Sequence, residues 1–348
     1  MTRLRVLVAV AQHGSVTAAA RSLNYAQPSV SHHLARLEAE TGARLTQRSG
    51  RGIRLTDAGR LLAGRAEEIL GRLDAAEREL AAHVEQRQER IRLAVFASAL
   101  ATIVPAALSR LAAGHPGIDL LLSEAEPPEA MRMLRAGQVD VALVSRHTQN
   151  GTPVGPPAAA EGARTRLILD EQVHLVTRPR HRGAQAVGQP GGTQPGGTQP
   201  SSDQPGGGQP AADEAGPPDL AAHAHSPWIA GCEHCRGHLI WLCQHAGFSP
   251  KIAFTTDDHV AAQALVAAGL GVTIMPGLAI SAARHPGIHS QPLPGAWRQV
   301  LAVTYGQPPD PRAVDHLLDI LTLAAAATAT GPGSRSPAGG PGAGTSVA

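Results

Sequence analysis

The sequence predicts a mixed α/β protein with a helical N-terminal module, one long helix, and a larger region of alternating strands and helices. Three observations support this. Apolar residues recur at helical spacing in residues 1–41, and a heptad pattern follows in residues 57–90. From residue 90, short runs rich in Val, Ile and Leu alternate with helical stretches, which is typical of parallel βαβ units. At 348 residues the chain should form two or more domains.

The N-terminal module begins with three predicted helices. Residues 2–12 form the first, and residues 15–23 and 27–41 form a pair joined by a tight turn. Ser15 is a natural N-cap for the second helix, and Gly42 is suited to end the third. The pair is therefore predicted to be a helix-turn-helix.

The third helix has two contrasting faces. Val30, Leu34 and Leu37 recur at helical spacing and should face inward. Pro28 suits the first position of this helix. The other side carries short polar groups and a cation, which can bind base edges in a major groove: Gln27, Ser29, Ser31, His32, His33 and Arg36. A purely solvent-facing role for His32 stays open.

A hairpin is predicted after Gly42. Residues 44–48 and 53–55 suit two strands around a Ser-Gly-Arg-Gly turn, which makes the module a winged helix-turn-helix. Arg48, Arg51 and Arg54 could reach phosphate or an adjacent minor groove. The alternative is a solvated hairpin that does not touch DNA. Nine arginines and three acidic residues give residues 1–60 a net charge of +6, whereas the whole chain carries +2, so a polyanionic partner is favoured.

A long helix should run from an N-cap at Thr56 or Asp57 to about Arg90. Its apolar residues step by four and three, which is the heptad pattern of a paired helix: Leu62, Ala66, Ile69, Leu73, Ala76 and Leu80. Two interpretations stay open, a helix that pairs two chains and a helix that packs against its own domain. We prefer the first.

The N-terminal segments closely resemble the LysR-type transcriptional regulators. The resemblance is carried by residues 4–11, 14–20, 27–31, 37–38, 42–45 and 48–59. Thr46 departs from the family, which usually has a Phe there that packs under the wing. The resemblance implies a dimerising linker helix, then two α/β lobes like a type 2 periplasmic binding protein with an inducer between them. The expected domains are 1–58 for DNA binding, 59–89 for dimerisation, 90–330 for effector binding, and a disordered tail at 331–348.

Strands and helices alternate in the expected effector domain. Strands are predicted at 91–95, 118–122, 139–144, twice within 166–177, and at 228–230, 252–255, 271–276 and 300–304. Helices are predicted at 98–113, 128–136, 235–246, 259–268 and 311–325. Within 184–218 Gln-Pro recurs every five residues with almost no apolar content, so we expect a disordered insert, the alternative being a polyproline docking segment.

Ligands of such folds bind at helix N-termini and at the carboxyl ends of strands. The predicted effector-binding residues occupy such positions: Ser98, Ala99, Arg146, Gly231, Cys232, Thr256 and Pro276. Ser98 could instead simply cap its helix.

Cys232, Cys235 and His238 have a spacing that can bind zinc or form a thiol switch. We favour ordinary packing and pocket lining, because the CxxC has no second pair and Cys243 falls on an apolar helix side with Leu239 and Leu242. No metal or cofactor is therefore expected.

Several protein classes are disfavoured. No run of 18 apolar residues and no signal-peptide pattern occur, and three cysteines do not make a disulfide framework, so a soluble cytoplasmic protein without membrane contact is expected. The absence of a P-loop, a GxGxxG motif or a catalytic constellation argues against an enzyme.

The expected function is sequence-specific binding of promoter DNA, modulated by a small-molecule effector. The resemblance implies a dimer or tetramer and a possible contact with RNA polymerase. Two alternatives are a solute-binding protein with a helical N-terminal adaptor and an architectural nucleic-acid binder without a ligand.

Overall fold

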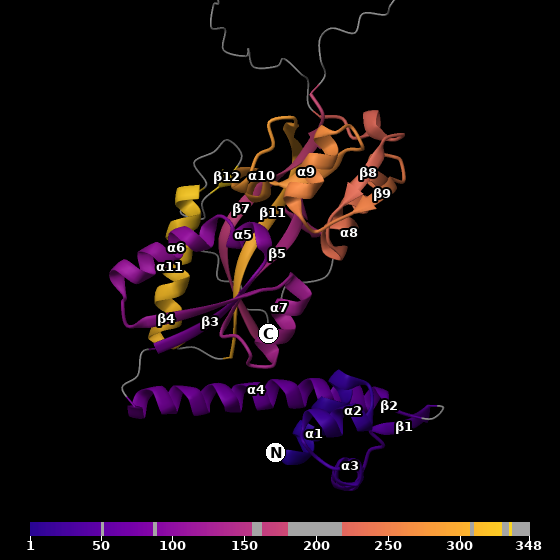
Figure 1. Ribbon diagram of the computed structural model, residues 1–348, viewed down its shortest axis with the longest axis vertical. Coiled ribbons are helices and arrows are strands. Elements are labelled where there is room, and N and C mark those ends of the chain that lie inside the picture. Colours follow the sequence, from indigo (N-terminus) through magenta and orange to yellow (C-terminus); the bar gives the residue numbers. More distant parts are fainter. Residues whose placement is uncertain are drawn as a thin grey trace, which may run out of the picture. The chain divides into compact units, whose positions relative to one another are not determined.

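The computed structural model describes residues 1–49, 52–85, 89–154, 162–179, 218–306, 310–328 and 334–335 (Figure 1). The chain forms two compact units. The first unit comprises residues 1–171 and 297–348, and the second unit comprises residues 172–296.

The N-terminal module of the first unit contains the predicted helices and hairpin. Its elements are α1 (Thr2–His13), α2 (Val16–Ser22), α3 (Gln27–Thr41), β1 (Thr46–Ser49) and β2 (Gly52–Leu55), with β1 and β2 antiparallel. The Ser15 Oγ accepts a hydrogen bond from the Ala18 amide at 3.1 Å, so the predicted N-cap is confirmed. Gly42 ends α3 in the left-handed conformation with φ 66°. Apolar residues from α1, α2, α3 and the wing share one core.

The long helix α4 (Asp57–Glu85) follows the wing. The Thr56 Oγ1 accepts from the Gly59 amide at 3.0 Å, which confirms the predicted start. The predicted end at about Arg90 is wrong, because β3 (Glu89–Val95) begins at Glu89 and its backbone pairs with a neighbouring strand from that residue. The boundary expected at residue 89 therefore falls inside the sheet.

A glycine of α4 lies against the turn after a helix of the same unit. A Cβ on Gly71 would lie 2.6 Å from the Arg135 carbonyl oxygen and 2.7 Å from the Gly137 nitrogen. Gly137 has φ +63° and is itself close to the Gly71 backbone. The two backbones touch because neither residue has a side chain. Beside them, the Arg72 guanidinium lies 5.0 Å from the centre of the Tyr305 ring.

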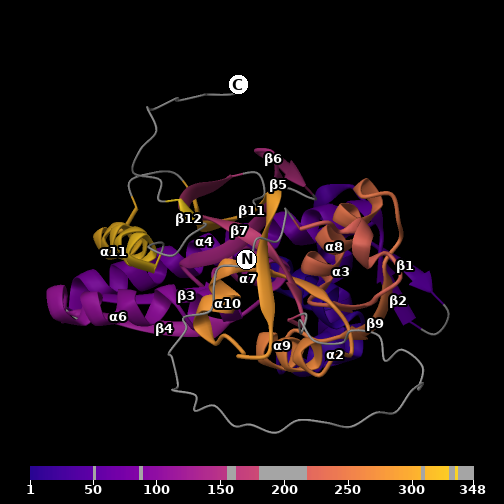
Figure 2. The same ribbon diagram turned by 90° about the horizontal axis from the view of Figure 1, so that it is seen from above.

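The rest of the first unit is α/β. Strands β3, β4 (Ile118–Glu124) and β5 (Val141–Gln149) are parallel, and β6 (Thr152–Val154) pairs antiparallel with β5. The helices are α5 (Ala97–Leu100), α6 (Ile103–Gly114), α7 (Pro127–Arg135) and α11 (Arg312–Thr328). Helices α6 and α11 lie side by side (Figure 2), and the rings of His115 and His316 stack between them at 4.3 Å.

The single helix predicted at 98–113 is wrong, since α5 and α6 are separate. The Thr102 hydroxyl donates to the Ser98 carbonyl at 2.6 Å. A threonine hydroxyl that competes for a helix carbonyl favours a break of this kind.

Two long strands pass from one unit into the other. These are β7 (Ala163–Thr177) and β11 (His289–Tyr305), which are neighbours in the sheet of order β10-β7-β11-β5-β3-β4. The two strands predicted within 166–177 are thus one. The strand predicted at 300–304 starts eleven residues earlier, at His289. Pro292 and Pro294 argued against a strand there, because proline donates no ladder hydrogen bond.

The second unit contains a βαβ unit made of β8 (Pro227–Ala230), α8 (Glu233–His245) and β9 (Lys251–Thr255), with the two strands parallel. The 3-10 helix η1 (Ala221–His223) precedes it, and α9 (His259–Ala267), β10 (Thr273–Pro276) and α10 (Gly277–Ala282) follow. Helix α10 was not predicted. Cys243 is fully buried with Leu239 and Leu242, which confirms its predicted packing role.

The predicted disordered segments are mostly outside the described residues. Residues 184–217 of the insert are among them, whereas Pro218 is described. In the tail, Ser334 and Arg335 form β12, antiparallel to β7 at Asp170 and Glu171, so the prediction of disorder is wrong for those two residues. Such pairing uses backbone groups of a strand edge and needs no apolar side chain. Within the described residues, no helix has both the length and the apolar character needed to cross a membrane.

Candidate functional site

Most of the polar side of α3 is presented to solvent. We call its exposed residues the reading face: Gln27, Pro28, Ser29, Ser31, His32 and Arg36. His33, which was predicted on the same side, is half-buried. On the opposite side Val30 is 0%, Leu34 3% and Leu37 6% exposed in the core of the module. The packing of these three residues therefore fixes the direction in which the reading face points.

Tyr25 lies beside the reading face, although it was not predicted to be functional. It is 43% exposed, and its ring centre is 6.0 Å from that of His33, whose ring is 6.2 Å from that of His32. Asn24, with φ 54°, forms the turn just before it. The sequence did contain a signal for Tyr25: it is an aromatic residue in the turn of a helix-turn-helix, a position that does not need an aromatic side chain for core packing.

The wing is attached to α3 through Glu38. One oxygen of this carboxylate, Oε1, accepts from the Leu45 amide at 2.8 Å, the Thr46 amide at 2.9 Å and the Thr46 hydroxyl at 3.0 Å. Burial raises the pKa of Glu38, but these hydrogen bonds outweigh it and hold the pKa below its ordinary value of 4.5. Thr46 thus contributes a polar anchor between the wing and α3.

The two wing arginines that the structure describes, Arg48 and Arg54, lie apart. Arg48 pairs with Ile53 and Arg54 pairs with Gln47 in the hairpin register. Because side chains alternate along a strand, Arg48 and Arg54 project from opposite faces of the wing. Both are exposed, whereas Arg51 lies outside the described residues.

Part of the positive charge of the module is paired with carboxylates. Arg3 lies 2.8 Å from Glu40, and Arg5 lies 3.4 Å from Asp74. These pairs are exposed, so each contributes little to stability. Their effect is to lower the positive potential on the α1 side relative to the wing.

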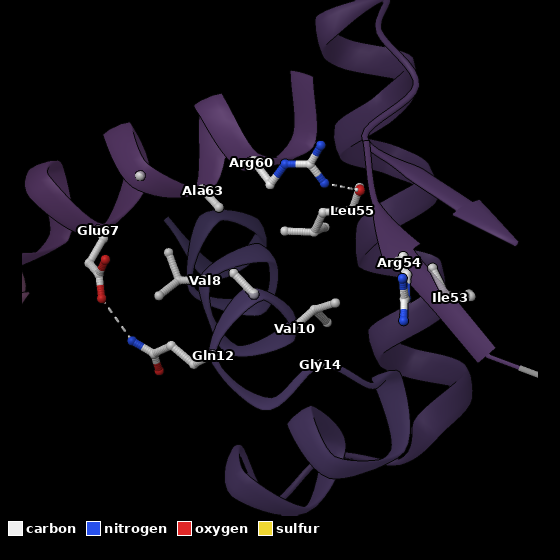
Figure 3. Close-up of a pocket in the computed structure, with 12 residues that line it drawn as sticks. Val8, Val10, Gln12, Gly14, Ile53, Arg54, Leu55, Arg60, Ala63 and Glu67 are labelled. Atoms are coloured by element: carbon white, nitrogen blue, oxygen red, sulfur yellow. Dashed lines mark hydrogen bonds between the residues drawn. The ribbon is translucent and has the colours of Figure 1, made fainter. Parts of the chain in front are cut away.

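A depression of about 460 Å³ lies between α1, β2 and α4 (Figure 3). Beside it the Gln12 Nε2 donates to the Glu67 Oε1 at 2.9 Å, and the Arg60 Nη1 donates to the Leu55 carbonyl at 2.9 Å. Its lining residues come from α1, Gly14, β2 and α4, and none from α3. It is therefore separate from the reading face.

The predicted seam of α4 is divided between two adjacent faces. Ala66 is fully buried, and it lies on the same side as the buried Ala63 and Leu70, so it packs within its own chain. By contrast, Ile69 is 50% and Leu80 65% exposed. With Ala76, also exposed, they form an apolar stripe on α4. We call these three residues the α4 stripe.

Ser98 is joined to a buried ion pair of the first unit. Its Oγ accepts from the Arg298 Nη2 at 2.9 Å, and the Arg298 Nε donates to the Glu171 Oε1 at 2.7 Å. The guanidinium also lies 4.9 Å from the centre of the Phe96 ring. Arg298 is 3% and Glu171 2% exposed. Neither was predicted, because they are 127 residues apart and each sits in a strand with no local signal.

Two other predicted effector residues belong to the first unit. Arg146, half-buried on β5, donates to the Gln299 Oε1 from Nε at 3.2 Å and from Nη2 at 2.5 Å. Ala99 is fully buried in α5, so only its backbone could face a ligand.

The remaining predicted effector residues belong to the second unit. Gly231 and Cys232 follow β8 and are half-buried, as is Thr256 after β9. The Thr256 amide donates to the Ala230 carbonyl at 3.0 Å, which brings the carboxyl ends of β8 and β9 together. Pro276 is buried and precedes α10. In the part of the chain that the structure describes, no group of three or more His, Cys, Asp or Glu residues is placed to hold a metal ion.

Two protein-family models match the chain. Residues 1–60 match "Bacterial regulatory helix-turn-helix protein, lysR family", and residues 85–326 match "LysR substrate binding domain". A relative described as "Uncharacterized HTH-type transcriptional regulator YcgK", from Bacillus subtilis, is 27% identical over 80% of each chain. A "Probable hydrogen peroxide-inducible genes activator" from Mycobacterium avium is 28% identical over 80% of this chain and 78% of its own.

Solved structures share the fold. Full-length OxyR from Pseudomonas aeruginosa is similar with a TM-score of 0.56 at 21% identity, covering 92% of this chain and 94% of its own. Full-length CbnR complexed with its target DNA gives a TM-score of 0.53 at 21% identity, covering 93% and 99%.

Proposed function

This chain belongs to the LysR family of bacterial transcriptional regulators, and we propose that it binds promoter DNA sequence-specifically under the control of a small-molecule effector. The observation that carries the proposal is the reading face: polar and cationic groups exposed on a helix whose other side is locked in a core. An α-helix of this kind fits the major groove, where each base pair has a distinct pattern of donors and acceptors.

Each DNA contact has a proposed role. Gln27, Ser29, Ser31 and His32 would contact base edges, and Pro28 would pack beside them at the helix start. Arg36, Arg48, Arg51 and Arg54 would contact phosphates. Since Arg48 and Arg54 project from opposite wing faces, they would bind different phosphates or strands.

A dimer would present two reading faces to a pseudo-palindromic site. We propose that the α4 stripe pairs two copies, and that two dimers can form a tetramer. Contact with RNA polymerase on the promoter is a further part of the proposal. The protein would act in the cytoplasm, where its DNA is.

The effector would bind within residues 90–330. In the first unit, Ser98, the Ala99 backbone and Arg146 are the proposed contacts, and in the second unit they are Gly231, Cys232, Thr256 and Pro276. Support comes from the positions of most of these residues at helix starts and strand ends. Arg146 is the exception, because β5 continues to Gln149 and the predicted strand end at residue 144 is wrong. The effector would shift DNA binding through its differential affinity for two states of the protein.

The rival function of a solute-binding protein with a helical adaptor is disfavoured, because residues 1–60 match a DNA-binding family model. An architectural binder without a ligand is disfavoured by the match of residues 85–326 to a substrate-binding domain.

The proposal is tested by measuring binding of the full-length protein to DNA flanking its own gene, at several salt concentrations. Ser31→Ala should reduce discrimination between specific and random DNA by about 1–3 kcal/mol. Arg48→Ala should weaken binding to all sequences alike and lower the salt slope by about one. Arg110→Ala, which removes an exposed arginine from α6, is the matched control and should change neither.

Equal effects of Arg48→Ala and Arg110→Ala would contradict the wing contact. Binding that does not discriminate between DNA sequences would contradict the proposed function as a whole. Thermal shift against a metabolite panel tests the effector, since stabilisation by one compound is expected.

A further inference from the structure

Two cysteines flank the first turn of α8 in the second unit. Cys232 is the N-cap, with φ −53° and ψ 166°, and Cys235 is the third residue of the helix. The N-cap and the third helical residue both belong to the first turn of a helix. Both cysteines therefore lie at the start of α8, three residues apart.

The chain immediately before Cys232 folds closely over Cys235. A Cβ on Gly231 would lie 3.3 Å from the Cys235 Cβ and 4.0 Å from its Sγ. The Arg236 amide donates to the Cys232 carbonyl at 2.8 Å, which ties the N-cap to the helix. A side chain at position 231 would thus crowd Cys235, whereas glycine leaves room for it.

The chemistry of the site differs from that of the third cysteine. Cys232 and Cys235 are half-buried, so a small molecule can approach them. Cys243, on the same helix, is fully buried, and burial raises the pKa of its thiol to about 12, so it is unreactive. Amides at the α8 N-terminus stabilise an anion, which favours the thiolate in the first turn.

The surrounding topology is that of a redox motif rather than a metal site. Strands β8 and β9 are parallel and α8 connects them, so the CxxC follows a strand and opens the helix of a βαβ unit. Burial, with a smaller effect of His234, lowers the pKa of the nearby His238 to about 4, so its imidazole is neutral at pH 7.

We propose that Cys232 and Cys235 form a reversible dithiol–disulfide pair that exchanges with low-molecular-weight disulfides such as oxidised glutathione. One thiolate attacks the glutathione disulfide, forms a mixed disulfide and releases one glutathione thiolate. The second cysteine thiolate attacks the mixed disulfide, the Cys232–Cys235 bond forms and the second glutathione leaves. Two protein thiols are oxidised, and one glutathione disulfide is reduced to two thiols.

This chemistry does not depend on the proposed function. One consequence does rest on it: oxidation would remove the thiol of Cys232, a proposed effector contact at the carboxyl edge of β8.

The test uses the full-length protein in glutathione buffers of graded oxidised-to-reduced ratio, quenched with acid and alkylated. Trypsin cleaves after Arg182 and Arg236, so residues 183–236 carry Cys232 and Cys235, while residues 237–251 carry Cys243. In oxidising buffer the first peptide should lose two hydrogens, take up no alkyl group, and recover both thiols on reduction. Cys243 should stay reduced throughout.

Two variants sharpen the result. Cys243→Ala should oxidise as the unaltered protein does, whereas Cys232→Ser should give only a glutathione adduct on Cys235, with an unchanged far-UV circular dichroism spectrum. The proposal is overturned if both thiols remain alkylated at every ratio, if the disulfide includes Cys243, or if the unaltered protein accumulates glutathione adducts instead of the internal disulfide.

Discussion

At the scale of single residues, charged groups with several partners determine the local structure. Glu38 holds the wing to α3 through three donors from Leu45 and Thr46. Arg298 holds Glu171 and Ser98 inside the first unit. The partners of Glu38 lie seven and eight residues along the chain, whereas those of Arg298 lie 127 and 200 residues away.

Glu38→Gln should destabilise the N-terminal module by about 1–2 kcal/mol at pH 7, because an amide oxygen accepts these hydrogen bonds more weakly than a carboxylate. The pKa of Glu38 is lower in the folded protein than its ordinary 4.5, so the folded state releases this proton more readily than the unfolded chain. This stabilisation is therefore complete above about pH 4.5 and is lost as the pH falls through the folded value.

The effect is measured on the full-length protein by using hydrogen exchange to monitor the thermal unfolding of residues 1–85, at pH 7 and at pH 3. Glu40→Gln, at an exposed pair with Arg3, is the control and should change stability little. A Glu38→Gln deficit of the same size at both pH values would contradict this account.

Helical periodicity in the sequence separated the reading face from Val30, Leu34 and Leu37, but it also placed the half-buried His33 on that side. It could not predict the Arg298–Glu171 pair. Two strands were predicted within residues 166–177, but Glu171 lies inside the single strand β7, where an unpaired carboxylate would be costly. Arg298 on β11 is the ion-pair partner that offsets the cost of burying Glu171. No pattern in the sequence around Glu171 reveals this partner.

At the scale of elements, α4 meets different surroundings on its different sides. Ala63, Ala66 and Leu70 are buried on one side, Gly71 touches the Gly137 backbone on another, and the α4 stripe is exposed. The heptad pattern predicted the helix and its start, but it could not tell which apolar residues would be covered by the same chain. Ala66 was assigned to the seam for that reason.

Gly71→Ala should lower the free energy of unfolding by about 1–3 kcal/mol, because its Cβ would lie 2.6 Å from a backbone oxygen that cannot rotate away. Gly64→Ala, in the same helix with no atom within 4 Å of the added Cβ, should raise it by up to about 1 kcal/mol. Urea unfolding of both variants makes the comparison. Equal stability of the two variants would show that α4 does not rest on Gly137.

At the scale of the whole molecule, assembly depends on a surface that one chain leaves open. The sequence and the family both pointed to dimerisation, and the exposure of Ile69 and Leu80 is what such a surface requires. The family resemblance implied two α/β lobes after the long helix, and the chain forms two compact units, residues 1–171 with 297–348 and residues 172–296. The full length of β7 and β11 could not be predicted, because a strand that is shared by two units carries no sequence signal at the point where one unit ends.

If the α4 stripe pairs two copies as proposed, Ile69→Glu combined with Leu80→Glu should convert the proposed dimer to a monomer. It should also weaken DNA binding at least tenfold, because two reading faces would no longer bind together. Light scattering coupled to gel filtration measures the mass. Leu61→Glu changes an exposed leucine outside the α4 stripe and should leave the dimer intact. If the double variant stays dimeric, other surfaces must join the copies.

The ion pair between Glu171 and Arg298 has a consequence for the architecture of the chain. It fastens the place where the polypeptide leaves the first unit to the place where it re-enters, on the adjacent strands β7 and β11. The second unit is thus an insertion into the first unit, and the ion pair holds together the two points at which the insertion is attached. When these two attachment points are held together, lengthening the inserted segment adds little to the entropic cost of closing the loop between them. The second unit, including the segment with the Gln-Pro repeats, could therefore be lengthened or replaced during evolution while the first unit keeps its fold.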